Sequence, residues 1–263
     1  PFSIVILKVG FMLISLLHCP VDLTLGVPFG RGLSFIVKFF TFAKSNLDLD
    51  AAAHTNVFGI NNEGRINNVL INPEISGECK VSLNTYIISK PLLMSMITDA
   101  AAKGIYSFAK SILQAQCGRY KIMAYKHEGY FSKITSIKSY YDANMALLDT
   151  ESRKKLFPDN APVYTKIRDN PPAKFAIGAK VKNSLIGDGC IIEGTVENSI
   201  LFRGVKVKKG SVVRNCVLMQ DTVVEPSVEL DCVVTDKNVK ITAGKKLSGT
   251  ESFPVYVQKN HTV

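Results

Sequence analysis

The sequence of 263 residues predicts an α/β domain followed by a parallel β-helix of hexapeptide repeats. Two observations lead to this fold class. In the last third of the chain a short phrase with apolar β-branched residues recurs four times, and in the middle third strand-like and helix-like segments alternate. A proline-rich stretch, which predicts a linker, separates the two patterns. We therefore expect four segments: 1–45, 46–150, 151–173 and 174–263.

Residues 1–45 receive no fold assignment. The chain begins at Pro1 rather than Met, and residues 2–17 form an apolar run that Lys8 interrupts. This run is short for a membrane span of about 20 residues. It also lacks the charged start and the small-residue cleavage site of a signal peptide. We predict a truncated or garbled N-terminus, with a buried core segment as one alternative and a membrane or export segment as another.

Residues 46–150 predict an incomplete α/β domain. Residues 55–71 have the composition of two strands joined by an Asn- and Gly-rich hairpin turn. A helix is expected from Lys90–Pro91, because proline suits the first turn of a helix. Its apolar face consists of Leu92, Leu93, Met96 and Ile97. A further strand is predicted at 121–125 and a further helix at 137–148.

The most regular pattern lies between residues 176 and 243. The four phrases begin, 15, 17 and 16 residues apart, at Asn183, Asn198, Asn215 and Asp231. Within them apolar residues return at steps of six, which is typical of hexapeptide repeats stacked in triangular coils. About four coils fit, and one wall is expected to hold Ile186, Leu201, Leu218 and Val234. The apolar tail 253–257 is expected to pack on the last coil or on a neighbouring chain.

Composition narrows the functional classes. The net charge of +10 is spread along the chain, whereas a nucleic-acid binder concentrates its basic residues on one face. We therefore expect no nucleic-acid partner. Sites for phosphorylated or anionic small molecules explain the excess of basic over acidic residues better. The six cysteines have no C-x-x-C spacing and do not cluster with histidine. Neither structural zinc nor disulfides are expected, and reduced thiols predict a cytoplasmic protein without a membrane partner.

Several phrases occur in a characteristic order across both domains. They are Gly-Tyr-Phe at 129–131, Ser-Tyr-Tyr-Asp-Ala-Asn-Met-Ala-Leu-Leu at 139–148, Pro-Val-Tyr-Thr at 162–165 and Pro-Pro-Ala-Lys-Phe at 171–175. Over roughly residues 50–263 the chain resembles the glucose-1-phosphate adenylyltransferase (ADP-glucose pyrophosphorylase) family, and within it the GlgD-type subunits. The resemblance implies a partial α/β nucleotidyltransferase-like domain followed by a left-handed parallel β-helix of hexapeptide repeats. It also implies formation of ADP-glucose and pyrophosphate from ATP and glucose 1-phosphate, for glycogen synthesis.

The resemblance marks the positions where the family holds its metal and its sugar phosphate. The metal-binding Asp of the family corresponds to Lys133, and its sugar-phosphate Glu-Lys pair corresponds to Ile71 and Asn72. An ammonium group repels magnesium instead of coordinating it. We therefore predict no catalytic and no metal-binding residue in this chain, and Mg²⁺ is expected only in an active family member. Lys133 either holds a phosphate directly or is a solvated surface residue.

Four other residues are candidate binding positions by the same resemblance. Ser82 matches a family serine near the sugar, and Lys110 keeps a family lysine in a phrase whose two acids are lost. Both are predicted to bind substrate. Arg168 and Lys174 lie near the domain junction and are predicted to contact anionic effectors, with an ordinary linker charge as the alternative.

Three functions stay open. The first is a regulatory, largely non-catalytic subunit of glucose-1-phosphate adenylyltransferase, whose partner is a catalytic homologue in a hetero-oligomer, expected to be a tetramer. The second is a fragment of a catalytically active sugar-phosphate nucleotidyltransferase, which would need an Asp where Lys133 stands. The third is a hexapeptide acyltransferase, which would need a catalytic His on a coil, and residues 174–258 contain none.

Overall fold

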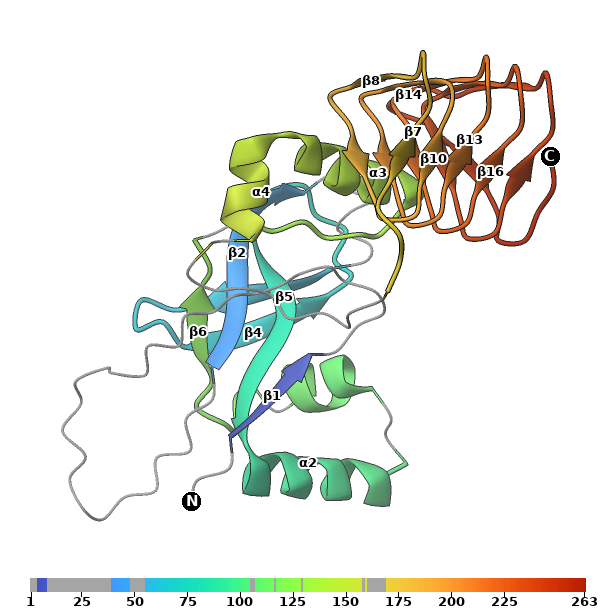
Figure 1. Ribbon diagram of the computed structural model, residues 1–263. Helices are drawn as coiled ribbons and strands as arrows, with labels where there is room; N and C mark the ends of the chain where they lie inside the picture. Colours follow the sequence, from blue (N-terminus) through green and yellow to red (C-terminus); the bar gives the residue numbers. More distant parts are fainter. Residues whose placement is uncertain are drawn as a thin grey trace. The chain divides into compact units, whose positions relative to one another are not determined.

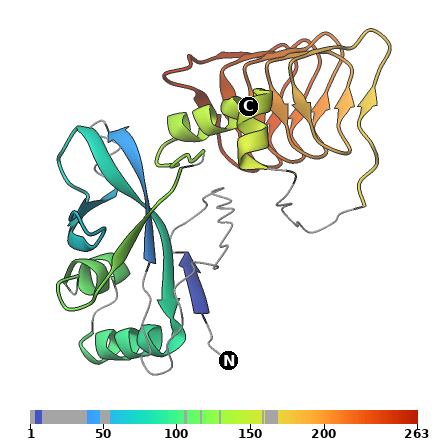
Figure 2. The same ribbon diagram turned by 90° about the vertical axis from the view of Figure 1, so that its left-hand side faces the viewer.

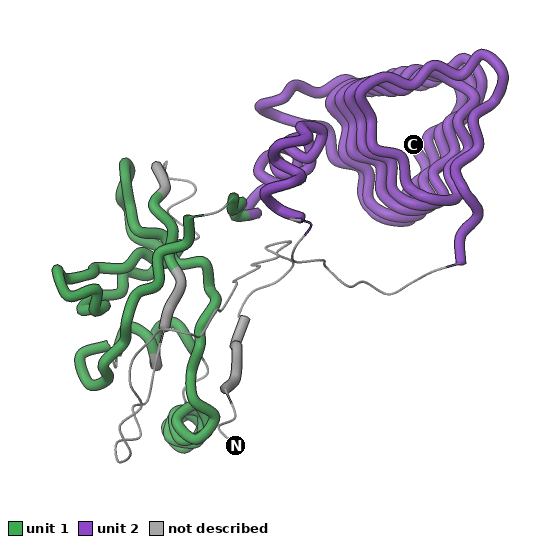
Figure 3. The backbone as a smooth tube through the Cα atoms, turned by 60° about the vertical axis from the view of Figure 1, so that its left-hand side comes forward, with its two compact units in different colours: residues 1–14, 19–133 green, residues 15–18, 134–263 purple. Residues whose placement is uncertain are grey.

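A computed structural model describes most of the chain, and it divides into two compact units (Figure 3). The described residues are 4–8, 39–47, 55–104, 107–115, 117–128, 130–157, 159 and 169–263. The boundary between the units lies between Lys133 and Ile134. Residues 134–150, which the sequence assigns to the α/β domain, therefore belong to the second unit. Most of segment 1–45 and Arg168 lie outside the described residues.

The described part of the first unit is built on a six-stranded sheet (Figure 1). Its strand order is β4-β3-β5-β2-β6, and β1 also pairs with β5. The strands are β1 (Ile4–Lys8), β2 (Phe39–Leu47), β3 (Asn56–Ile60), β4 (Ile66–Ile71), β5 (Gly77–Ser89) and β6 (Met123–Lys126). Neighbouring strands are antiparallel, except that β2 and β6 run parallel.

The predicted hairpin and the predicted first helix are both confirmed. Strands β3 and β4 pair antiparallel, and the Asn61 side chain shapes their turn by accepting backbone N–H bonds from Glu63 and Arg65 at 3.1 and 2.8 Å. Helix α2 (Lys90–Ala102) buries Leu92, Leu93 and Met96, whereas the side chain of Ile97 is 47% exposed. A π-helix, η1 (Phe108–Gln114), completes the apolar core of this unit.

The second unit contains a parallel β-solenoid whose rungs are visible in Figures 1 and 2. Three sheets of five parallel strands form its walls, β7-β10-β13-β16-β19, β8-β11-β14-β17-β20 and β9-β12-β15-β18-β21. Four turns of the chain lead from β7 to β19, as the repeats predict, and β20 and β21 complete a fifth rung. None of the helices in the described residues is long and apolar enough to cross a membrane. The left hand that the resemblance implies stays a prediction.

The strands of the solenoid are short. They are β7 (Lys174–Phe175), β8 (Lys180–Lys182), β9 (Leu185–Ile186), β10 (Ile191–Ile192), β11 (Thr195–Glu197), β12 (Ile200–Leu201), β13 (Lys206–Val207), β14 (Val212–Arg214), β15 (Val217–Leu218), β16 (Val223–Val224), β17 (Glu229–Asp231), β18 (Val233–Thr235), β19 (Lys240–Ile241), β20 (Lys246–Ser248) and β21 (Val255–Val257). Each pairs with its equivalent one rung away, so stacking between rungs supplies the stability that a single coil lacks.

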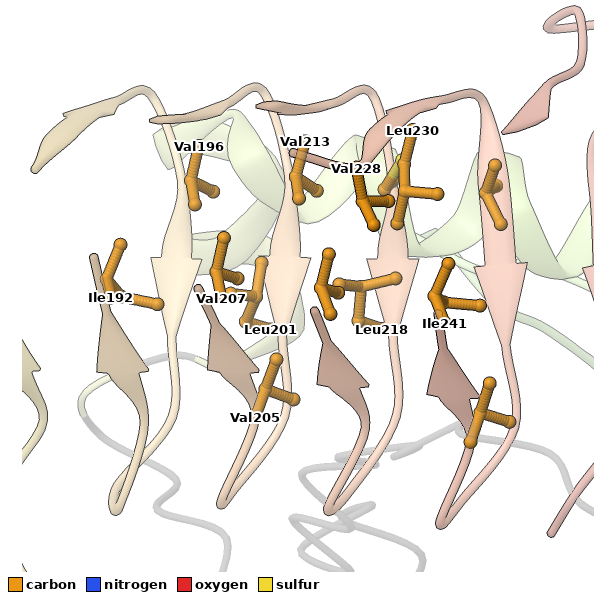
Figure 4. Close-up of a cluster of buried hydrophobic side chains, with 14 of the residues drawn as sticks. Ile192, Val196, Leu201, Val205, Val207, Val213, Leu218, Val228, Leu230 and Ile241 are labelled. Atoms are coloured by element: carbon orange, nitrogen blue, oxygen red, sulfur yellow. The ribbon is translucent and has the colours of Figure 1, made fainter. Parts of the chain in front are cut away.

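The four residues predicted for one wall lie in one sheet, with a shift of one position in register at the last of them. Leu201 pairs with Ile186 and with Leu218, and Figure 4 shows such side chains filling the interior. In the next rung Val234 lies in β18 of the same wall, as predicted, but it pairs with Val217, and Thr235 is the residue that pairs with Leu218. The cause is a 17-residue step. The left-handed backbone conformation of Asn215 (φ 48°) recurs at Cys232 (φ 50°) and not at Asp231.

A helix covers the outer face of the solenoid wall that contains β15 and β18. Helix α3 (Ile137–Met145) begins after Ser136, whose side chain caps it, and continues into η2 (Ala146–Leu148) and α4 (Thr150–Leu156). Buried Tyr141 packs on Val217 and Val234, and its hydroxyl donates to the backbone oxygen of Asn215 at 2.9 Å. These contacts explain why residues 134–150 belong with the solenoid.

The residues that follow β20 pair with two strands at the C-terminal end of the solenoid. Strand β21 pairs with β18, which confirms the predicted packing of the apolar tail on the last coil, although Phe253 is 82% exposed. Beyond it the backbone N–H groups of Lys240 and Thr242 donate to the carbonyl oxygens of His261 and Val263, at 2.9 and 2.7 Å. Residues 261–263 thus satisfy backbone groups at the edge of β19, whereas β20 and β21 are the last strands of their sheets among the described residues.

Candidate functional site

Lys133 is the last residue of the first unit, and its side chain is fixed in place. The Nζ atom donates a hydrogen bond to Thr55 Oγ1 at 2.7 Å. Thr55 directly precedes β3 and is 1% exposed, and Lys133 itself is partly buried. Lys133 is therefore not a freely solvated surface residue, which was one of its two sequence-based interpretations.

The positions equivalent to the family's sugar-phosphate pair lie beside the same threonine. Ile71 ends β4 and pairs with Asn56, and the backbone N–H of Asn72 donates to the Thr55 carbonyl oxygen at 2.9 Å. Thr55 thus contacts Lys133 through its side chain and Asn72 through its backbone. Three positions, Thr55, Asn72 and Lys133, thus meet at the open end of the β3–β4 hairpin, opposite its turn. Sequence reasoning missed Thr55, because its neighbours in the sequence give no sign of this role.

The ammonium group of Lys133 is electrostatically unbalanced within the described residues. Burial lowers the pKa of Lys133 to about 8, because water no longer surrounds the charged form. The ion pairs among the described residues involve other lysines and arginines. No carboxylate in this part of the chain therefore offsets the cost of removing the Lys133 charge from water.

A magnesium ion does not fit the residues at this position. The Lys133 ammonium has three N–H donors and no acceptor, and one donor already points at Thr55. Magnesium instead requires oxygen ligands, of which carboxylates are the usual protein contribution. The described residues also include no group of three His, Cys, Asp or Glu side chains that could hold a metal ion.

The predicted substrate residue Ser82 is buried in β5 and takes part in a polar network. Asn84 has a left-handed backbone (φ 52°), and its N–H donates to Ser82 Oγ at 3.2 Å. The Tyr86 hydroxyl donates to Asn84 Oδ1 at 3.1 Å and lies 3.5 Å from Ser82 Oγ. Burial raises the pKa of Tyr86 to about 12. The Ser82 hydroxyl thus supports a bend in β5, and its predicted contact with substrate stays a prediction.

The other candidates lie on exposed surfaces. Lys110 is exposed on η1, so the two predicted substrate residues differ in burial. Lys174 is exposed on β7 in the second unit, where it pairs with Ile191. Its predicted partner Arg168 lies outside the described residues. The effector role of Lys174 and the substrate role of Lys110 stay predictions.

The fold and the site define a protein with an α/β unit and a hexapeptide solenoid, whose α/β unit carries a fixed lysine. Residues 171–251 match the family model described as "GlmU-like, C-terminal hexapeptide". The chain is 37% identical over 178 residues to the glycogen biosynthesis protein GlgD of Bacillus subtilis, which covers 68% of this chain and 52% of that protein. It is 31% identical over 198 residues to a glucose-1-phosphate adenylyltransferase of Bacillus cereus, covering 74% of this chain and 53% of that protein.

A GlgD of Geobacillus stearothermophilus is 38% identical over 152 residues, covering 55% of this chain and 44% of that protein. The chain therefore belongs to the family that contains the glucose-1-phosphate adenylyltransferases and the GlgD proteins, as the sequence phrases predict. It spans about half the length of the curated relatives it matches.

Proposed function

We propose that this chain is part of a glucose-1-phosphate adenylyltransferase subunit that serves glycogen biosynthesis in the cytoplasm and is regulatory rather than catalytic. The names of the relatives support the pathway and the reaction class. One observation supports the regulatory role: an ammonium group, fixed by Thr55, stands where active family members are expected to hold a metal carboxylate.

The proposed loss of catalysis follows from charge. Nucleotidyl transfer places negative charge on phosphate oxygens, and a metal held by carboxylates usually neutralises it. Here Lys133 replaces the carboxylate, and Asn72 replaces the cation that grips the sugar phosphate. Losing charge stabilisation at one such position costs on the order of a hundredfold in rate. Two such losses are expected to bring turnover by this chain close to background.

The chain would then act on a catalytic homologue in a hetero-oligomer, which we expect to be a tetramer. Regulation requires only that the chain bind the active and inactive states of its partner with different free energies. Lys174 and Arg168 are the proposed contacts for an anionic effector in such an assembly, because both are cations in or directly after the proline-rich segment that precedes the solenoid.

The test measures pyrophosphate release from ATP and glucose 1-phosphate in the presence of Mg²⁺. Three samples are compared: the protein that carries this chain alone, a catalytically active glucose-1-phosphate adenylyltransferase alone, and the two together. We expect background turnover from the first sample. We expect a changed rate or effector response in the third, together with co-elution of the two proteins in size-exclusion chromatography.

Substantial turnover by the chain alone would overturn the non-catalytic half of the proposal. Separate elution, with an unchanged rate and effector response of the catalytic homologue, would overturn the regulatory half. The Lys174→Ala variant tests the effector contact in the same mixture. Lys180→Ala is its matched control, because Lys180 is an exposed lysine on β8 of the same rung.

A further inference from the structure

We propose that Lys133 is the anchor of a metal-free anion site, in which its ammonium group binds the phosphate of a sugar phosphate. The inference rests on the proposed function for the sugar part of the ligand and on the geometry of the first unit for the anion. It gives this part of a non-catalytic subunit a ligand-sensing role.

A neighbouring threonine fixes the direction of the Lys133 ammonium group. An ammonium group has three N–H donors, and the bond to Thr55 Oγ1 at 2.7 Å uses one of them. Because Thr55 is 1% exposed, this bond holds the charged end of Lys133 against the body of the sheet. The hydrogen bond from Asn72 N–H to the Thr55 carbonyl in turn fixes Thr55 at the open end of the hairpin, opposite its turn. The remaining two donors of Lys133 are therefore presented from a rigid support.

The Lys133 ammonium group has no carboxylate partner among the described residues. A partly buried cation is normally paired with an anion, because an isolated charge loses its hydration without compensation. Among the described residues none of the carboxylates that form ion pairs does so with Lys133. A bound anion would provide the compensation and would favour the protonated amine. A lysine that is held in place and has no counter-charge in the protein is therefore a candidate binding site for an anion from solution.

The chemistry of an ammonium group favours a phosphate as the anion. A compact ammonium binds phosphate as a point charge, and its charge-assisted hydrogen bonds are stronger than neutral ones. Lys133 would thus supply directly the positive charge that a magnesium ion supplies in an active homologue. Such a site needs no divalent metal, and it binds the ligand without advancing the reaction. The predicted ligand is glucose 1-phosphate, whose phosphate group carries the recognition.

The experiment measures binding of glucose 1-phosphate by isothermal titration calorimetry, with EDTA in one series and Mg²⁺ in the other. The variants are Lys133→Met, which keeps the length of the stem, and Lys133→Arg, which keeps the charge. Lys121→Met is the matched control, because Lys121 is an exposed lysine of the same unit. Glucose without phosphate is the control ligand. Circular dichroism and melting curves without ligand establish that each variant is folded.

We expect the wild-type chain and Lys121→Met to bind glucose 1-phosphate in EDTA, and Lys133→Met to bind it about 10- to 100-fold more weakly. Lys133→Arg is expected to retain part of the affinity, and glucose alone is expected not to bind. Equal affinity in wild type and Lys133→Met, dependence on Mg²⁺, or no binding by the wild type would each overturn the inference.

This outcome is separable from that of the proposed function. If the chain forms a complex with a catalytic homologue and changes its rate, but does not bind glucose 1-phosphate through Lys133, only the anion site fails. If it binds glucose 1-phosphate through Lys133 but forms no complex, the regulatory role fails and the anion site stands.

Discussion

The two units of this chain differ in what they do with buried polar groups. In the solenoid two buried hydroxyls join successive rungs: the Ser199 hydroxyl donates to the Glu197 carbonyl and accepts from the N–H of Cys216, in the next rung. Ser211 connects Glu225 and Val228 in the same manner. In the first unit the partly buried ammonium of Lys133 has no carboxylate partner among the described residues. Buried hydroxyls thus have structural partners in both units, and the buried side-chain atom that lacks a hydrogen-bond partner among the described residues, Gln220 Oε1, lies in the solenoid. What sets the α/β unit apart is a partly buried charge without a counter-charge among the described residues.

The units also differ in the reach of their contacts. A solenoid residue meets its equivalents 15 to 17 positions away, as Leu201 meets Ile186 and Leu218. In the first unit Phe39 pairs with Met123, and Lys133 reaches Thr55. Because both cores close within their own unit, damage to one core is expected to leave the other intact.

The largest expected effect on stability comes from truncating one buried side chain in either core. Leu218 and Ile88 are each fully buried, in the solenoid and in β5 respectively. Replacing either by alanine is expected to cost about 2–5 kcal/mol, because a cavity adds to the lost burial. Hydrogen exchange followed by mass spectrometry is expected to show lost protection in the mutated unit alone. The exposed Lys206→Ala, on β13, is the control and is expected to change stability by less than about 0.5 kcal/mol.

Equal loss of protection in both units, from either variant, would show that they unfold as one cooperative body. The contrast between the two cores would then hold for their architecture but not for their stability.

A smaller effect is expected from adding one methyl group at a glycine of each unit. A Cβ at Gly194 would lie 2.4 Å from the Ser211 carbonyl oxygen and 2.9 Å from that of Lys208, so the next rung would have to shift. Gly194→Ala is expected to cost about 1–3 kcal/mol. At Gly118, in the first unit, the same methyl group meets no atom within 4 Å, so Gly118→Ala is expected within about 1 kcal/mol of wild type. Urea unfolding measures both, and a harmless Gly194→Ala would mean that the rungs are loosely stacked.

The solenoid was the more predictable unit because apolar residues recur at regular six-residue steps in its sequence. The six-residue steps fix which residues face inward, and the pairing of Leu201 with Ile186 and Leu218 confirms them. Val234 lies in the predicted wall, but it pairs with Val217 instead of Leu218, because the phrases are 16 residues apart here and the structural step is 17. Only the backbone conformation of Cys232, which follows Asp231, reveals the true corner.

The site was predictable in part. The resemblance placed Ile71, Asn72 and Lys133 at family positions, but it could not show that the three converge. Their link is Thr55, which lies 78 residues from Lys133 in the sequence and has no motif of its own. The role of α3 was hidden for a similar reason. Its apolar face predicts burial, but the sequence does not say that Tyr141 packs on the solenoid rather than on the α/β sheet.

The smallest expected effect is a pH dependence confined to the first unit. Burial holds the pKa of Lys133 at about 8 in the folded chain, whereas an unfolded lysine has a pKa of about 10.4. Below pH 8 both states carry the proton, and the cost of burying the cation is fully present. Between about pH 8 and 10.4 the unfolded state binds more protons than the folded one, so stability rises with pH. Above that range both states are neutral, and the cost is absent.

Lys133→Met removes this dependence. The free energy of unfolding of the wild type is therefore expected to rise relative to that of the variant, by on the order of 1 kcal/mol between pH 7.5 and 10. The measurement is native-state hydrogen exchange in the segment that contains Asn72, whose N–H donates to Thr55, with both proteins compared at each pH. The comparison cancels the intrinsic pH dependence of exchange and the titration of other groups. Lys121→Met is expected to follow the wild type. Parallel curves for wild type and Lys133→Met would show that the Lys133 charge is already balanced in the folded chain, and the contrast between the two units in their buried polar groups would then disappear.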